Sequence, residues 1–228
     1  YNYLSPQLGP EITLGPGEPS GENDAVVDID SQNHIHIAFR ANGYLSYFNH
    51  LNGTLQSVST GVMESMQYPE MTIDMMDHIH IVYRLTSDKR LYHLQFDGNT
   101  FNTPVAITPA TAGRPAYYRS IATDDNCRLY VPYQNSVSSG PKGFFLVHGK
   151  NGNFTPPELV FEDNTGSYVS RMSTSVAARG NGQVAIIYSP GGLRNSDLIS
   201  DIFLKEGFMF AQQQGILTVT PDSLNFTD

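Results

Sequence analysis

Two segments of this chain nearly repeat each other, and they constrain its fold more than any other feature. The sequence DIDSQNHIHIAFR spans residues 28–40, and IDMMDHIHIVYR spans residues 73–84. Equivalent residues are offset by 44 positions, among them Asp30 and Asp74, His36 and His80, and Arg40 and Arg84. A constant offset of roughly 20–50 residues is the signature of a repeat architecture. The chain is therefore expected to be built from repeated units.

Two more divergent repeats follow the first two. Asp124 lies 50 residues after Asp74, and Tyr188 lies 55 residues after Tyr133. Unequal spacings are expected where insertions fall in loops, which is where repeat proteins tolerate them. The sequence therefore indicates four repeats.

Each repeat reads as four strands. The second strand alternates strictly, as in His-Ile-His-Ile-Ala-Phe at residues 34–39, and a period of two is typical of a strand. An aromatic-rich third strand is expected at residues 44–48, 91–96, 144–148 and 199–204. Each third strand leads into a glycine-containing hairpin turn, the last of them at residues 206–207. Four antiparallel strands in about 45–50 residues form one propeller blade, so the predicted fold class is an all-β propeller.

The two ends of the chain predict an incomplete blade. Residues 1–216 are assigned to the propeller, with a half blade at residues 1–16 and repeats at 24–68, 69–115, 116–168 and 169–216. Residues 217–228 are expected to be a closing strand or the start of a following domain. A blade shared between the two termini would make five blades in all. A strand left unpaired there would be a template for another chain.

Charge and cysteine content limit the class of partner. The 228 residues carry 13 basic and 22 acidic side chains, a net charge of −9. Phosphate binding needs a basic surface, so nucleic acid is not expected as a partner. The single cysteine, Cys127, cannot form a disulfide within the chain and is expected to be a buried apolar residue. No apolar run reaches the roughly 20 residues of a membrane-spanning helix, so membrane insertion is not expected.

The repeat pattern resembles a known family. D-x-x-x-H-I-H-I-x-[FY], followed by an aromatic strand and a glycine turn, is similar to the BNR repeats of sialidase-superfamily propellers, over about residues 24–215. The resemblance implies a propeller from a family of glycosidases, polysaccharide lyases and non-catalytic sugar-binding modules. The family's S-x-D-x-G-x-T-W motif is absent, and the chain has no Trp. That departure puts sialidase activity in doubt.

A second resemblance lies at the C-terminal end. The sequence LTVTPDSLNF at residues 217–226 looks like the opening strand of Ig-like domains in bacterial surface proteins. It implies a longer secreted polypeptide. Together with the first resemblance, it leads us to expect a bacterial protein that is secreted or at the cell surface.

The His-Ile-His pairs invite a metal hypothesis, but the repeats favour a structural role. A neutral imidazole can bind zinc, and alternation places His34 and His36 on one face of their strand. In the third repeat, however, the equivalent positions hold Arg128 and Tyr130. We therefore expect these side chains to pack against a neighbouring blade and to hydrogen-bond to backbone. The recurring Asp30, Asp74 and Asp124 are expected to cap their own turns, and no metal or other cofactor is predicted.

A ligand site is predicted where the second strands end. In a propeller, the loop that enters each inner strand and the loop after each second strand share one face. Aromatic rings stack on sugars and guanidinium groups bind carboxylates, so an acidic glycan is a chemically sensible ligand. The alternative is ordinary packing between blades. The predicted ligand-binding residues are Tyr68, Tyr117, Tyr118, Tyr168, Arg40, Arg84, Arg114 and Arg119.

Three functional hypotheses remain open at this stage. The first is a non-catalytic binding or adhesion module that recognises glycan or protein. The second is a structural subunit that self-assembles into a homo-oligomer by exchanging strands at the split blade. The third is a sialidase-superfamily glycosidase or polysaccharide lyase. No nucleophile motif or phosphate loop is visible, and no catalytic residue is assigned.

Overall fold

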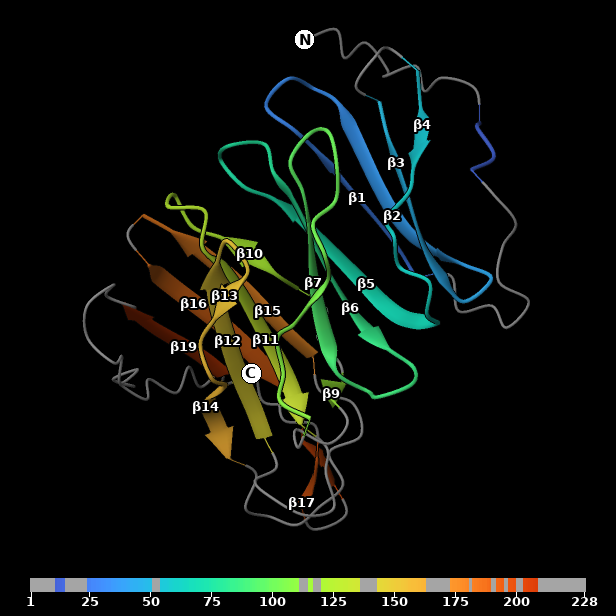
Figure 1. Cartoon of the computed structure of the whole chain (residues 1–228). Coiled ribbons are helices and arrows are strands. Elements are labelled where there is room, and N and C mark those ends of the chain that lie inside the picture. Colours follow the sequence, from blue (N-terminus) through green and yellow to red (C-terminus); the bar gives the residue numbers. More distant parts are fainter. Residues whose placement is uncertain are drawn as a thin grey trace, which may run out of the picture.

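The computed structural model describes most of the four repeats and little of the two ends. The described residues are 11–14, 24–50, 54–110, 115–116, 120–135, 143–162, 173–180, 182–189, 192–194, 197–199 and 203–208. All regular structure within these ranges is β (Figure 1). No helix in the described part is long and apolar enough to cross a bilayer. This confirms the predicted all-β class.

The first two repeats each form a four-stranded antiparallel sheet in simple sequence order. Blade A consists of β1 (Ala25–Ile29), β2 (Ile35–Ala41), β3 (Tyr44–Asn49) and β4 (Gln56–Val58). Blade B consists of β5 (Met66–Ile73), β6 (Ile79–Leu85), β7 (Leu91–Phe96) and β8 (Val105–Ala106). Both match the blade expected from the repeat.

The third repeat forms a larger sheet, blade C. Its inner strands are β9 (Pro115–Ala116) and β10 (Ala122–Thr123), which both pair with β11 (Leu129–Asn135). The third strand β12 (Gly143–Lys150) pairs with β13 (Asn153–Phe154) and with the outer strand β14 (Glu158–Glu162).

The fourth repeat departs from the expected strand positions. Blade D consists of β15 (Ser173–Arg179), β16 (Gln183–Ser189) and β19 (Phe203–Phe208). A separate hairpin, β17 (Gly192–Arg194) and β18 (Asp197–Ile199), is inserted before β19. The prediction of one strand at 199–204 and a turn at 206–207 is therefore wrong, because Glu206 and Gly207 lie inside β19 and pair with β16.

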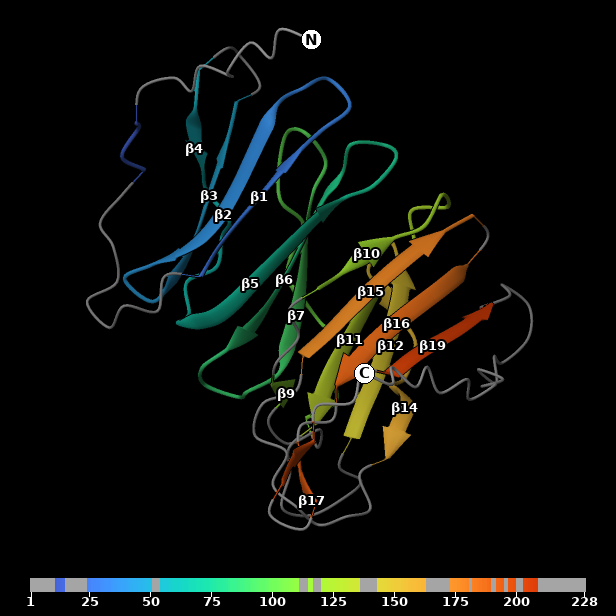
Figure 2. The same cartoon turned by 180° about the vertical axis from the view of Figure 1, so that it is seen from behind.

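The four blades follow one another in an arc, and the apolar core lies between them. Figure 2 shows the inner strands side by side in the order β1, β5, β10 and β15. Three clusters of buried side chains fill the spaces between blades A and B, B and C, and C and D. Apart from residues 11–14, which form no strand, the proposed half blades at the two ends lie outside the described residues. The split blade and the repeat boundaries remain predictions.

The inner hairpin of blades A, B and C turns in the same way each time. The amide nitrogens of Asn33, Asp77 and Cys127 donate to the carbonyls of Asp30, Asp74 and Asp124 at 2.9–3.1 Å. These three donor residues have φ of 65, 61 and 58°. A type I turn followed by a residue in the left-handed region is a standard three-residue hairpin. Asn and Asp tolerate that conformation, so in blades A and B this part of the turn follows from the residue types, whereas in blade C a cysteine adopts it.

Candidate functional site

The ends of the second strands form the face on which a ligand site was predicted, and we call this face the rim. Arg40, Arg84 and Gln134 occupy equivalent positions there. Each pairs with a residue at the start of the third strand of its blade, namely Leu45, Leu91 and Phe144. The repeat thus places a polar side chain at the same level of three successive blades.

Arg84 and Tyr68 are in direct contact on the rim. The guanidinium carbon of Arg84 lies 5.0 Å from the centroid of the Tyr68 ring. A guanidinium within about 6 Å of an aromatic ring is attracted to its face. Arg84 Nη2 also donates a hydrogen bond to Gln67 Oε1 at 2.5 Å. Arg84 is only 9% exposed, so these contacts hold the guanidinium in one orientation.

Tyr68 is presented by a bulge in the inner strand of blade B. The register of β5 against β6 shifts between Gln67 and Glu70, and Tyr68 has φ of 55°. A bulky residue in the left-handed region is uncommon, and such strain concentrates at functional sites. Bulges re-aim side chains and are frequent beside active sites. The bulge therefore marks this part of the rim as a candidate site.

Asp24 ties the bulge to blade A. Its Oδ2 accepts a hydrogen bond from the Tyr68 amide at 3.2 Å, and its carbonyl accepts one from the Arg40 amide at 3.1 Å. The end of β2 and the start of β5 are thereby fixed relative to each other. Of the predicted site residues, the structure brings Tyr68 and Arg84 into contact and joins Arg40 to them through Asp24.

The other five predicted site residues lie outside the described residues. They are Tyr117, Tyr118, Tyr168, Arg114 and Arg119. Their part in the site stays a prediction.

The rim also contains residues that the sequence analysis missed. Gln67 and Asp24 hold Arg84 and Tyr68 in place, but a lone Gln or Asp beside a strand carries no recognisable pattern. On blades C and D, the side-chain oxygens of Asn135 and Thr174 are buried, and neither has a hydrogen-bond partner in the described part of the chain. The strand pairing places both residues at the rim, because Asn135 ends β11 and Thr174 pairs with Tyr188 near the end of β16. No sequence pattern marks them.

Further positive charge lies in the loop between β6 and β7 of blade B. Arg90 Nε donates to the Thr108 carbonyl at 2.8 Å, and its guanidinium carbon is 5.8 Å from the centroid of the Tyr92 ring. Lys89 donates to the Thr86 carbonyl. The rim of blade B therefore has two contacts between a tyrosine ring and a guanidinium, Tyr68 with Arg84 and Tyr92 with Arg90. They lie in a chain whose net charge is −9.

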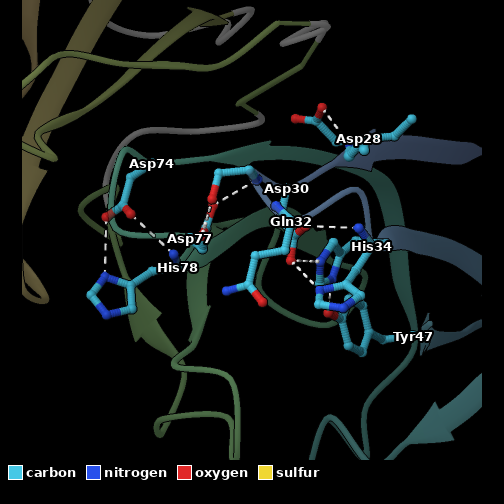
Figure 3. Close-up of polar contacts among 11 residues, drawn as sticks. Asp28, Asp30, Gln32, His34, Tyr47, Asp74, Asp77 and His78 are labelled. Atoms are coloured by element: carbon cyan, nitrogen blue, oxygen red, sulfur yellow. Dashed lines mark hydrogen bonds and ion pairs between the residues drawn. The ribbon is translucent and has the colours of Figure 1, made fainter. Parts of the chain in front are cut away.

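The recurring aspartates lie at the other end of the inner strands and cap their own turns, as predicted, and Figure 3 shows two of them, Asp30 and Asp74. Asp30 Oδ1 accepts hydrogen bonds from the amides of Gln32 and His34 at 2.9 and 2.7 Å. Asp74 and Asp124 accept from the two equivalent amides of their own turns at 2.8–3.0 Å. Burial alone would raise the pKa of Asp30, but the hydrogen bonds from His34, His36 and Gln32 outweigh it and lower the pKa to about 2.

The histidines bind these carboxylates rather than backbone, so that detail of the prediction was wrong. His36 Nε2 lies 3.3 Å from Asp30 Oδ2, and His36 Nδ1 lies 2.6 Å from the Tyr47 hydroxyl. In blade C, Tyr130 takes the same place and donates its hydroxyl to Asp124 Oδ2 at 3.0 Å. The position is a structural link between the turn and the second strand, which histidine and tyrosine both satisfy.

Blade B extends this link by a second histidine. His80 Nε2 lies 3.2 Å from Asp74 Oδ2, and His80 Nδ1 lies 2.9 Å from His93 Nε2. Within the described part of the chain, no group of three or more His, Cys, Asp or Glu side chains is arranged to hold a metal ion.

Comparison with known proteins identifies similar folds but no family. No family model matches the chain, and no curated protein does. The polysaccharide lyase Uly1 matches with a TM-score of 0.58 and 12% identity, over 88% of this chain and 60% of the lyase chain. A protein of unknown function from Dyadobacter fermentans matches with a TM-score of 0.52 and 14% identity, over 81% of this chain and 65% of that one.

These similarities bear on the fold alone. They support the β-propeller class and place a carbohydrate-active protein among those that share it. The chain spans about three-fifths of the length of the lyase chain it matches. The narrower resemblance to BNR repeats stays a prediction.

Proposed function

We propose that this chain is a carbohydrate-active propeller domain whose rim binds a polysaccharide that carries carboxylate groups. The contact between Tyr68 and Arg84 carries the proposal. A tyrosine ring offers an apolar face to a sugar ring, and a guanidinium is the donor best matched to a carboxylate. A uronic acid residue combines both features in one sugar.

Arg84 is nearly buried and its guanidinium is held in one orientation, so we expect it to bind a carboxylate that fits this geometry as well as its charge. A charge-assisted hydrogen bond is about twice as strong as one between neutral groups. Gln67 and Tyr68 hold the guanidinium in one orientation, so little conformational entropy is lost when a ligand binds. The Tyr68 ring is half-buried and leaves part of its surface for a ligand.

Cleavage of the bound polysaccharide is the second part of the proposal. The likeness in fold to a polysaccharide lyase favours a catalytic role over the purely adhesive module first expected from the sequence. A lyase must neutralise the uronate carboxylate before the neighbouring carbon can lose its proton, and Arg84 is the group we assign to that task. Polysaccharides of this kind are extracellular, which agrees with the secreted or cell-surface location expected from the sequence.

The test compares uronate-containing with neutral polysaccharides. We expect the wild-type chain to bind alginate, pectate or ulvan in preference to cellulose or xylan in affinity electrophoresis. Arg84→Gln should abolish the preference, and Tyr68→Asn should weaken binding at least about tenfold, as expected for the loss of one well-placed contact. Arg179→Ala, an exposed arginine at the other end of blade D, is the matched control and should bind as the wild type does.

Measuring reducing ends and ultraviolet absorbance then distinguishes hydrolysis from elimination. Both hydrolysis and elimination release reducing ends, but only elimination forms an unsaturated uronate that absorbs in the ultraviolet. Binding without either product would remove the catalytic half of the proposal. Equal binding to neutral and acidic polysaccharides, or unchanged binding by folded Arg84→Gln, would contradict the site itself.

A further inference from the structure

Each of the three contacts between successive described blades joins two different kinds of face. We call the leading face the side of a blade that contacts the blade before it, and the trailing face the side that contacts the blade after it. Alternate residues of the second strand form the centre of each leading face. In blades B, C and D these residues are at most 4% exposed. They are Ile79, Ile81 and Tyr83, then Leu129, Val131 and Tyr133, then Val184, Ile186 and Tyr188.

The leading face of blade A is uncovered. Ile35 occupies the position of Ile79 in blade B, yet it is 38% exposed where Ile79 is 0%. Ile35 and Ile37 pair with Ile29 and Val27 of β1, which are 57% and 67% exposed. The face keeps the apolar residues of a blade contact, although none of the described blades lies against it.

The trailing face of blade D is uncovered in the same way. Its central pair is Ile187 and Leu204, which are 47% and 37% exposed. The equivalent pair in blade A, Ala38 and Tyr47, is fully buried against blade B. Blades A and D lie at opposite ends of the arc in Figure 1, so the described part of the chain has one uncovered face of each kind.

We propose that the leading face of blade A binds the trailing face of blade D in a second copy of this chain. Contiguous exposed apolar surface marks sites of protein association. Only a trailing face reproduces the packing that buries the leading faces of blades B, C and D, and within the described residues blade D carries a trailing face that no other blade covers. The contact is therefore head-to-tail. Such a contact closes into a ring if its rotation allows, and otherwise forms an open chain of copies.

This contact differs from the strand exchange considered from the sequence. It packs one sheet on another through side chains and needs no new backbone pairing. It also stands apart from the glycan proposal, because neither Tyr68 nor Arg84 belongs to the two uncovered faces.

Two charge variants test the contact. Ile35→Lys disables the leading face and Ile187→Glu disables the trailing face, while each leaves the opposite face intact. We expect the wild type to associate as its concentration rises in light scattering coupled to size exclusion, and each variant alone to be monomeric. An equimolar mixture should form a dimer, because the intact trailing face of Ile35→Lys meets the intact leading face of Ile187→Glu. Met63→Glu, at a residue that is 86% exposed in the loop before β5, should associate as the wild type does.

Three outcomes would overturn the proposal. A wild-type chain that is monomeric at every concentration shows that something other than a second copy covers the faces, or that nothing does. Dimers formed by Ile187→Glu alone show that two leading faces pair with each other. Variants that associate as the wild type does place the contact elsewhere. Circular dichroism confirms that each variant is folded before its mass is interpreted.

Discussion

The hydroxyl of Ser31 in blade A donates a hydrogen bond to the carboxylate of Asp77 in blade B at 2.6 Å, and the Ser31 amide donates to the same carboxylate at 2.9 Å. Both residues lie in inner hairpin turns of the same geometry. The turn of blade B therefore anchors the turn of blade A, so these two turns link neighbouring blades as well as joining their own strands.

The contribution of the Ser31–Asp77 hydrogen bonds to stability can be measured by comparing glycine substitutions at two equivalent turn positions. Asn33 and Asp77 are equivalent, with φ of 65 and 61°, but only Asp77 binds the neighbouring blade. Glycine tolerates this conformation without strain. We expect Asn33→Gly to change the free energy of unfolding by no more than about 0.5–1 kcal/mol. Asp77→Gly should cost about 1–3 kcal/mol, because two hydrogen bonds to a charged group are lost. Urea denaturation compares the two, and equal effects would show that the Ser31 contact contributes nothing.

The Asp74 carboxylate should matter far more to stability than an exposed turn aspartate. It is 4% exposed and accepts from the amides of Met76 and His78 and from His80 Nε2. Each buried donor left without an acceptor costs about 1–3 kcal/mol, so Asp74→Ala should lose about 3 kcal/mol or more.

Asp97 provides the control for Asp74. It accepts from the amides of Asn99 and Thr100 at 2.9 Å in an exposed turn, where water can replace its carboxylate. Asp97→Ala should therefore be much less destabilising in the same urea titration. A loss as large as that of Asp74→Ala would mean that burial does not set the cost.

The sequence predicted the parts of the fold that repeat, and it failed where the repeat is interrupted. The offset between Asp30 and Asp74 located blades A and B because each turn has an aspartate at its start and a residue in the left-handed region three positions later. In blade D the hairpin of β17 and β18 is inserted before the third strand, and the prediction placed that strand too early, at residues 199–204. An inserted hairpin lengthens the spacing between repeats, but the spacing alone does not show where in the repeat the insertion lies.

The candidate site was predicted only in part for a related reason. Tyr68 and Arg84 were found because their loops share a face in any propeller. Their contact depends on the bulge between Gln67 and Glu70, which shifts one strand by a residue and has no sequence signature. The histidines posed the opposite problem. Their pattern was conspicuous, but their partners, the aspartate of the same turn and a residue on the third strand, follow only from the three-dimensional register.

Cys127 should be chemically inert in the folded chain. It is 6% exposed, and burial, together with the nearby Asp74 carboxylate, raises the pKa of its thiol. Because the thiolate is the reactive form, alkylation by iodoacetamide near pH 8 should be slow in the native protein and fast after unfolding in guanidinium. Mass spectrometry measures the modified fraction. Rapid alkylation of the native chain would contradict the buried position of this turn residue.

His93 should make the fold sensitive to mild acid. Its side chain is 1% exposed between His80 and the ring of Phe154. Burial, and then the charge of His80, lower the pKa of His93 to about 3. If His80 donates through Nε2 to the Asp74 carboxylate, its Nδ1 can accept from the Nε2–H of a neutral His93.

The sign of the effect follows from where the proton binds. In the unfolded chain His93 takes up a proton below its ordinary pKa of about 6.5, whereas in the folded chain it does so only near its lowered pKa. Its contribution to stability is therefore complete above about pH 6.5 and is lost as the pH falls toward 3, by up to about 1.4 kcal/mol per pH unit. The loss from Asp30 belongs to a lower window, since that group titrates between about pH 4 in the unfolded chain and about 2 in the folded one.

A substitution isolates this histidine. His93→Gln keeps a side-chain N–H that can donate to His80 but does not titrate, so urea denaturation between pH 7 and 4.5 should give a flatter dependence on pH than the wild type. His50→Gln, at a half-buried histidine after β3, is the control for replacing a histidine with glutamine. If His93→Gln loses stability as steeply as the wild type over this range, another group carries the acid sensitivity, and the buried pair of His80 and His93 is not its source.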